Sequence, residues 1–396
     1  MERIYLDYAA STPVNPEVKK AIVPYFDEKF GNAGSLHSFG REAISALDTS
    51  REKVAGILGT KFHEVIFTGS ATEANNLALR GIVKNYELGI RNNKNLSKFP
   101  VPRIVISSIE HESVLNTARD LEKEGVEVVY LAVSRDGFVN PEDVKAALTP
   151  NTVLVSVIYG SNVVGTIQPI REIAKVVKKY REKIGKPYPL FHTDASQALQ
   201  FLDINVGEFG IDLMSLSGQK IYGPKGAGVL YVSEDVLSLI SPIITGGDQE
   251  FGLRAATENI PAIVGFGKAA ELLSINKKNE AERIGNLRDK LWMGLKTKHP
   301  ELELNGPEFG LKRLPNNLNI YFPNHNLDEL IVKFDMAGIV VSVGSACSMR
   351  SARSSYVIKA LTGDDKKASH SVRFSLGRPT TSDEIDSAVS RILKLL

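Results

Sequence analysis

Apolar residues between positions 64 and 233 gather into short continuous runs that alternate with amphipathic segments. Runs that are apolar at successive positions are typical of strands buried on both faces of a parallel sheet, whereas half-buried strands alternate apolar and polar residues. We therefore expect seven strands, at 64–68, 103–109, 126–133, 152–159, 188–194, 211–217 and 226–233.

The segments around these runs carry apolar residues at helical spacing, and we expect them to be helices. Pro16 suits the first turn of a helix, and Gly59 suits the position that follows one. The helices are expected at 16–30, 41–58, 71–86, 112–125, 141–148 and 170–184. Alternating strands and helices predict an α/β fold with a mainly parallel seven-stranded sheet covered by helices.

The pattern changes after about residue 262. The elements expected there are one long charged helix, a short strand and two further helices, at 262–298, 316–322, 327–338 and 382–396. This mixture predicts a smaller α+β domain. We assign residues 16–261 to a large domain, and residues 1–15 together with 262–396 to the small one.

The composition is that of a globular protein, because 43% of the 396 residues are hydrophobic and 24% are charged. The 48 basic and 46 acidic residues give a net charge of +2, which provides no argument for a nucleic-acid or membrane-surface partner. The first residues, MERIYLDYAAS, include charges and form no continuous apolar core, and no apolar run is long enough to span a bilayer. We therefore expect a cytoplasmic protein without direct contacts to membranes or nucleic acid.

The chain has one cysteine, Cys347, so an intramolecular disulfide is excluded. A single thiol in a cytosolic protein is either an inert core residue or a reactive group. Glycine and other small residues surround it in the stretch VGSACSMRSARSS. That surrounding favours an exposed loop, as a reactive thiol requires.

The stretch SGQKIYGPKG, residues 217–226, is the most suggestive of chemistry. Lys220 follows an expected buried strand and precedes a glycine-rich turn. A desolvated amine loses its proton more easily, and a neutral amine can attack an aldehyde such as that of pyridoxal phosphate. The stretch by itself is equally compatible with a loop lysine beside a tight turn.

Polar residues also follow or end four other expected strands: Thr72, His111, Asn162 and Asp194. Taken singly, an aspartate before a helix is usually a cap, and a buried histidine is often simply hydrogen-bonded. The segment EHES lacks the second histidine of a helical zinc pair, so we expect no metal site. Because ligands bind beyond the carboxyl ends of parallel strands, these four residues and Lys220 together indicate a binding site.

Eight motifs occur in order between about residue 4 and residue 390: YLDYAASTP, FTGSATEANN, EHESVLN, GTIQPI, HTDASQ, SGQKIYGPKG, GSAC and RFSLGR. In these motifs the chain resembles cysteine desulfurases of the NifS/IscS type, in the class V aminotransferase family. The resemblance implies pyridoxal phosphate as cofactor, the aspartate-aminotransferase fold (fold type I) and a homodimer. It also implies L-cysteine as substrate, L-alanine as product, and a scaffold or carrier protein that accepts sulfur for iron–sulfur clusters or tRNA thiolation.

The resemblance also implies a role for each matching residue. Lys220 would hold the cofactor through its amine and move a substrate proton, and Asp194 would pair with the pyridine nitrogen. His111 would stack on the ring and handle protons, and Cys347 would take the sulfur as a persulfide. The implied contacts are Asn162 and Gln197 to the ring oxygen, Ala71, Thr72, Ser217, Gln219 and a partner's Thr257 to the phosphate, and Arg373 and Asn162 to the substrate. The alternative for Arg373 is a structural ion pair.

Two positions depart from the family pattern. Gln219, in SGQK, stands where a histidine is common, and Val163, in SNVVG, stands where an acidic residue is common. A selenocysteine lyase or another aminotransferase-like enzyme therefore stays an alternative, although an aminotransferase needs no loop thiol. A non-catalytic sulfur-assembly partner that retains the fold is a further alternative, against which the intact set of catalytic residues counts.

Overall fold

The structure is a computed structural model that describes residues 3–92, 100–343 and 354–396. A seven-stranded sheet forms its centre, in the strand order β2-β8-β7-β6-β5-β3-β4. The seven strands predicted from the apolar runs are confirmed: β2 Val65–Thr68, β3 Arg103–Ser107, β4 Glu127–Leu131, β5 Thr152–Ser156, β6 Leu190–Asp194, β7 Leu213–Ser217 and β8 Gly228–Val232.

The sheet is mainly parallel, as predicted. The pairs β3–β4, β3–β5, β5–β6 and β6–β7 are parallel, whereas β8 is antiparallel to both of its neighbours, β7 and β2. The link from β7 to β8, residues 218–227, holds a 3₁₀ turn (Gly218–Lys220) and no crossover helix. A parallel neighbour would need a longer crossover, so the chain returns in the opposite direction. The carboxyl ends of β2, β3, β5, β6 and β7 therefore lie at one edge.

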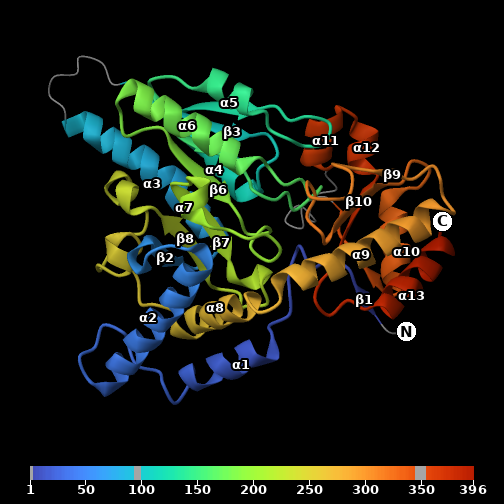
Figure 1. Cartoon of the computed structure of the whole chain (residues 1–396), viewed down its shortest axis with the longest axis horizontal. Coiled ribbons are helices and arrows are strands. Elements are labelled where there is room, and N and C mark those ends of the chain that lie inside the picture. The colour runs from blue at the N-terminus through green and yellow to red at the C-terminus, as the bar shows by residue number, and fades with distance from the viewer. Residues whose placement is uncertain (1–2, 93–99, 344–353) are drawn as a thin grey trace.

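Helices cover both faces of this sheet (Figure 1). Successive residues of one strand enter different cores: Ile66 packs with residues of α3 and α4, and Phe67 packs with residues of α2, α6 and α8. This division is the two-residue period of a strand buried on both faces. The covering helices are α1 Pro16–Ile22, α2 Ser38–Leu58, α3 Ala71–Asn92, α4 Glu112–Lys123, α5 Pro141–Ala147, α6 Ile170–Ile184, α7 Val206–Phe209 and α8 Ile260–Leu273.

A second body of structure joins the N-terminal strand to the C-terminal third of the chain (Figure 1). Strand β1 (Ile4–Tyr5) pairs in parallel with β11 (Ile339–Val340), and β10 (Asn317–Tyr321) lies between β9 (Glu303–Leu304) and β12 (Ser371–Ser375). The helices here are α9 Lys277–Lys296, α10 Leu327–Met336, α11 Tyr356–Thr362, α12 Asp365–Ser369 and α13 Ser382–Leu393. The exact domain boundaries stay a prediction.

Two predicted helices were too long. The expected helix at 262–298 is two helices, because α8 ends at Leu273 and α9 begins at Lys277. Asn276, with φ −148° and ψ 31°, interrupts the helical backbone, and here the chain passes from the core of the large sheet to the second core. The expected helix at 16–30 ends at Ile22 and tightens into a 3₁₀ turn, since Pro24 cannot donate the next helical hydrogen bond.

Membrane-spanning segments were sought among the helices of residues 3–92, 100–343 and 354–396. None of them combines the length and the apolar character that crossing a bilayer requires.

Candidate active site

A cavity of about 190 Å³ lies at the carboxyl edge of the sheet. Residues from the ends of five strands reach it, together with the N-terminal segment and β12. Ten of the predicted site residues line it: Ala71, Thr72, His111, Asn162, Asp194, Gln197, Ser217, Gln219, Lys220 and Arg373. Thr257 is exposed in the loop before α8 and does not line this cavity, and Cys347 lies outside the described residues.

Lys220 stands in a 3₁₀ turn, Gly218–Lys220, directly after β7. Its Nζ donates to the backbone oxygens of Ala9 and Ala10, at 2.7 and 2.6 Å. The same N-terminal segment is tied to the turn by Thr12, whose Oγ1 donates to the oxygen of Gln219 at 2.7 Å. The first residues of the chain therefore hold the amine in the cavity, which the sequence did not indicate.

Asp194 is the last residue of β6, and 5% of it is exposed. Its Oδ1 accepts from the backbone N–H of Ser196 at 2.9 Å, and its Oδ2 accepts from the amide of Asn75 at 2.8 Å. The N-cap alternative is not realised, because the residues after Asp194 form a turn and the next helix begins at Val206. The Ser196 bond is a local turn bond of the kind aspartates make. The second bond comes from α3 and fixes the carboxylate beside the cavity.

His111 is the N-cap of α4, and its Nδ1 accepts from the backbone N–H of Ser113 at 3.1 Å. The Oγ of Ser113 also lies 2.8 Å from this nitrogen. The ring is therefore held by the start of its own helix, in keeping with the alternative that the histidine is hydrogen-bonded. It nevertheless lines the cavity with Asp194 and Lys220.

Arg373, on β12, is buried and forms an ion pair, in keeping with the structural alternative for this residue. Its Nη2 lies 2.8 Å from Oδ1 of Asp7, and its Nη1 donates to the backbone oxygen of Asn162 at 3.1 Å. Its buried Nε finds no hydrogen-bond partner among the described residues. A buried donor without a partner is costly, so the guanidinium has capacity for one more acceptor.

The turn between β2 and α3 approaches β8 closely. A Cβ at Gly228 would lie 2.3 Å from the carbonyl carbon of Ser70, so only glycine fits there. Glu73 stabilises the turn, because its Oε2 accepts from the backbone N–H of Gly69 at 2.8 Å and its Oε1 pairs with Arg254 at 2.8 Å. The turn leads directly into the N-terminus of α3, where backbone N–H groups and the helix dipole favour an anion such as phosphate.

Two buried titratable groups flank the cavity. Burial raises the pKa of Glu110 to about 8, and burial lowers the pKa of His192 to about 4. Glu110 Oε1 accepts from Ser107 Oγ and from the backbone N–H of Ile158, at 2.5 and 2.6 Å. At neutral pH both groups are therefore mainly uncharged.

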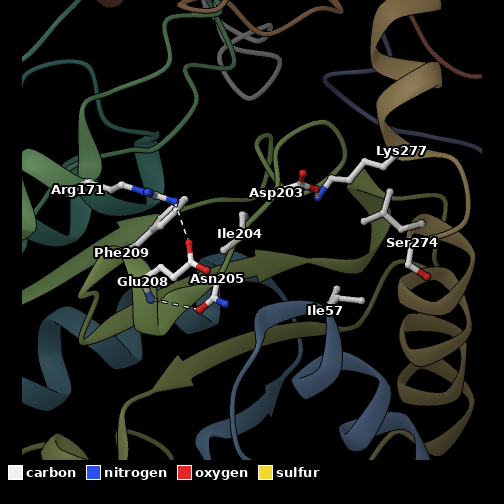
Figure 2. Close-up of a pocket in the computed structure, with 10 residues that line it drawn as sticks. Ile57, Arg171, Asp203, Ile204, Asn205, Glu208, Phe209, Ser274 and Lys277 are labelled. Carbon is white, nitrogen blue, oxygen red and sulfur yellow. Dashed lines mark hydrogen bonds and ion pairs between the residues drawn. The ribbon is translucent and has the colours of Figure 1, made fainter.

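A second, larger cavity of about 340 Å³ lies at the break between α8 and α9 (Figure 2). Its two cationic side chains already have acidic neighbours: Arg171 lies 3.2 Å from Glu208, and Lys277 lies 3.6 Å from Asp203. Arg171 also lies over the ring of Phe209, at 4.4 Å. None of the predicted site residues within the described ranges lines this cavity, whereas ten line the smaller one, so we assign the chemistry to the smaller cavity.

The residues of the smaller cavity fit pyridoxal phosphate. An amine (Lys220) suits its aldehyde, a buried carboxylate (Asp194) suits its pyridine nitrogen, and a helix N-terminus suits its phosphate. Two buried polar atoms at the cavity, Ser196 Oγ and Arg373 Nε, have no hydrogen-bond partner among the described residues. Such atoms are expected where a polar ligand completes the hydrogen bonding.

The family model for Aminotransferase class-V matches residues 4–388 of the chain. The chain belongs to this family. Cysteine desulfurase IscS of Dictyoglomus turgidum is 40% identical over 393 residues, which cover 99% of this chain and 94% of that protein. Cysteine desulfurase IscS of Clostridium botulinum (strain Hall) is 41% identical over 395 residues, which cover 100% of this chain and 94% of that protein.

A solved structure of a NifS-like protein is 32% identical, covers both chains completely and superposes with a TM-score of 0.88. The predicted resemblance and fold class are therefore confirmed. The chain is a pyridoxal-phosphate-dependent enzyme of the cysteine desulfurase type. The roles given to its individual residues stay predictions.

Sequence reasoning missed several residues that surround the predicted ones, among them Asp7, Ala9, Ala10, Asn75, Ser113 and Ser196. Asp7 and Ala9 lie in YLDYAASTP, and Asn75 lies in FTGSATEANN, so both motifs had already been singled out. Spacing within a motif does not reveal which distant residue a side chain will contact, and only the fold supplies that information.

Proposed function

We propose that this enzyme takes sulfur from L-cysteine, releases L-alanine and carries the sulfur as a persulfide on Cys347. The observation that supports the proposal is the single cavity that holds Lys220, Asp194, His111 and Arg373 together. An amine, a carboxylate, an imidazole and a guanidinium at one sheet edge match an amino acid bound to pyridoxal phosphate.

Pyridoxal phosphate, when bound, supplies an electron-withdrawing ring that stabilises negative charge on the substrate carbon next to the nitrogen. Lys220 would hold the cofactor through Nζ and later carry a proton to and from the substrate. Asp194 would accept a hydrogen bond from the ring nitrogen, and its own two donors would keep the carboxylate in place. His111 would lie against the ring and handle a proton.

Arg373 would bind the substrate carboxylate. The Asp7 ion pair and the Asn162 carbonyl leave Nε without a partner among the described residues. Arginine offers donors in a planar fork that matches a carboxylate. Asp7 pairs with Nη2, so it would orient the guanidinium and leave Nε to the substrate carboxylate.

The Cys347 thiolate would attack the sulfur of the substrate. A sulfur–sulfur bond forms, the carbon–sulfur bond breaks, and the substrate β-carbon keeps the electron pair and gains a proton. Enzyme thiol and L-cysteine thus give enzyme persulfide and L-alanine, with no external oxidant. A scaffold or carrier protein for iron–sulfur clusters or tRNA thiolation would then accept the sulfur.

The test measures alanine and sulfide from L-cysteine, with and without a thiol reductant, in the natural enzyme and in Cys347→Ala. We expect mass spectrometry without reductant to find one additional sulfur on the peptide that contains Cys347. We expect alanine formation to collapse in the variant while the visible cofactor spectrum persists. Normal alanine formation by Cys347→Ala, with that peptide unmodified, would instead support an aminotransferase-like or lyase chemistry. Parallel assays with L-selenocysteine test the selenocysteine lyase alternative.

We further propose that the enzyme is a homodimer, in which Thr257 contacts the phosphate in the partner subunit. Thr257 is exposed, and large apolar side chains are exposed in the region of α1 and α2, including Phe26 and Phe30 at 68% each. Exposed apolar groups in one region are typical of a protein–protein interface. The cytoplasmic location stays a prediction.

A further inference from the structure

We propose that Asn75 is a positioning residue that connects the carboxylate of Asp194 to the ring of His111 through the hydroxyl of Ser113, and that supports Nδ1 of this ring as a hydrogen-bond acceptor. Asn75 lies in the first turns of α3, and none of it is exposed. The inference rests on the proposed function only in that Asp194 and His111 are taken to face pyridoxal phosphate.

The amide nitrogen of Asn75 donates two hydrogen bonds. Nδ2 lies 2.8 Å from Oδ2 of Asp194 and 2.8 Å from Oγ of Ser113. Ser113 Oγ lies in turn 2.8 Å from Nδ1 of His111. Residues of β6, α3 and α4 are thus joined in one hydrogen-bonded chain beside the cavity.

The chemistry of Asp194 and His111 determines which atom donates in each hydrogen bond between them. An ionised carboxylate only accepts, so the nitrogen of the Asn75 amide must face Asp194. The second hydrogen of that nitrogen then occupies a lone pair of Ser113 Oγ, and the hydroxyl hydrogen is available to His111 Nδ1. The backbone N–H of Ser113 also donates to Nδ1, at 3.1 Å.

Both neighbours of His111 Nδ1 are therefore donors, and Nδ1 must be the acceptor. A neutral imidazole carries its proton on the other nitrogen when Nδ1 accepts. His111 would thus keep its proton on Nε2. Through Ser113, the Asn75 amide connects this ring to Asp194, the carboxylate that the cofactor nitrogen would face.

The oxygen of Asn75 supports a role beyond packing. Oδ1 is buried and has no hydrogen-bond partner among the described residues. An unpaired buried acceptor costs about 1–3 kcal/mol, so an apolar residue of similar shape would be cheaper if the site needed only volume. An asparagine is therefore justified here only if its two donated hydrogen bonds are needed to keep Asp194 and Ser113 in position.

The experiment compares Asn75→Leu, Ser113→Ala and Asn85→Leu with the natural enzyme as isolated with its cofactor. Asn85→Leu is the matched control, because Asn85 lies on the same helix and its hydrogen-bond partners, Ser238, Ser241 and Tyr188, do not line the cavity. Ring ¹⁵N shifts of histidine-labelled protein, assigned to His111 with a His111→Gln variant, report the tautomer without substrate. Cofactor dissociation is measured separately by dialysis and visible absorbance.

We expect the natural enzyme and Asn85→Leu to show His111 with an unprotonated Nδ1 and a protonated Nε2. In Ser113→Ala the hydroxyl donor to Nδ1 is lost but the backbone N–H of residue 113 remains, so the ¹⁵N shift of Nδ1 should change while the ring keeps its proton on Nε2. Cofactor affinity should change less than about twofold, because the hydrogen bond to Asp194 persists. Asn75→Leu should change the same Nδ1 shift and also weaken cofactor binding by about tenfold or more, since it loses a hydrogen bond to a charged group.

Unchanged ¹⁵N shifts of His111 in Ser113→Ala overturn the inference, even if Asn75→Leu does not fold. Lower thermal stability of Asn75→Leu with natural shifts would assign Asn75 a structural role only. Neither measurement involves turnover of L-cysteine, so failure of the proposed function and failure of this inference are distinguishable.

Discussion

Arg373 and Asp7 are 366 residues apart in the sequence, yet their side chains form an ion pair of 2.8 Å at the edge of the cavity. The side chain of Arg373 is 1% exposed and that of Asp7 is 13% exposed. A buried guanidinium without its carboxylate is strongly unfavourable. The pair therefore both stabilises the contact of β12 with the N-terminal segment and orients Arg373.

For Asp7→Asn we expect the KM for L-cysteine to rise by about tenfold, since Arg373 loses its orienting charge, and the thermal midpoint to fall. Steady-state alanine formation and thermal unfolding are the measurements. Asp120→Asn is the control, because it removes one partner of the surface pair with Arg80, which should cost at most about 1 kcal/mol. An unchanged KM with only lower stability would restrict Asp7 to a structural role.

Borohydride reduction of the purified enzyme, followed by peptide mapping, should place the cofactor on Lys220. The amine lies in the cavity against the backbone oxygens of Ala9 and Ala10. Lys225 is exposed in the same glycine-rich stretch, so Lys225→Ala should keep the label while Lys220→Ala loses it. Label recovered from any other lysine would contradict the assignment.

The buried carboxyl of Glu110 should make stability depend on pH. Burial raises its pKa from 4.5 to about 8, so between these values the folded protein binds a proton that the unfolded chain does not. Stability contributed by this group is complete below about pH 4.5 and declines as pH rises toward 8, at up to about 1.4 kcal/mol per pH unit.

In Glu110→Gln, whose amide resembles the protonated acid, this decline should be absent. Denaturant unfolding between pH 5 and pH 8 (roughly the window in which the two protonation states differ) measures the difference. Glu124→Gln, at an exposed pair with Arg80, is the control and should follow the natural enzyme. Parallel curves for the natural enzyme and Glu110→Gln would show that the carboxyl is not protonated in the folded state.

Mixed dimers should test whether Thr257 serves the partner's site. We expect Thr257→Ala to weaken cofactor binding, and Lys220→Ala to abolish turnover. A hybrid of one Thr257→Ala subunit with one Lys220→Ala subunit would contain one intact site if Thr257 acts across the interface. Such a hybrid should then regain about half of the natural activity, a simple consequence of one working site in two. If the hybrid is no more active than a mixture of the two separate variants, Thr257 acts within its own subunit or not at all.

The sequence predicted the strands of the large sheet and the edge at which the chemistry lies. Every apolar run became a strand because residues such as Ile66 and Phe67 are both buried, on opposite faces, and a continuous apolar run satisfies both faces at once. Lys220, Asp194 and His111 were found because each follows or ends such a strand, and the ends of parallel strands meet at one edge.

Only the tertiary structure determined the strand order, the direction of β8, the break between α8 and α9, and the contacts that hold the site. The amide of Asn75 and the carboxylate of Asp194 are 119 residues apart, and no local pattern joins them. Periodicity and turn propensity act within a few residues, so they fix local structure. Ion pairs and hydrogen bonds between distant residues depend on how the finished helices and strands pack, and that packing placed Asp7 beside Arg373 and Asn75 beside Asp194.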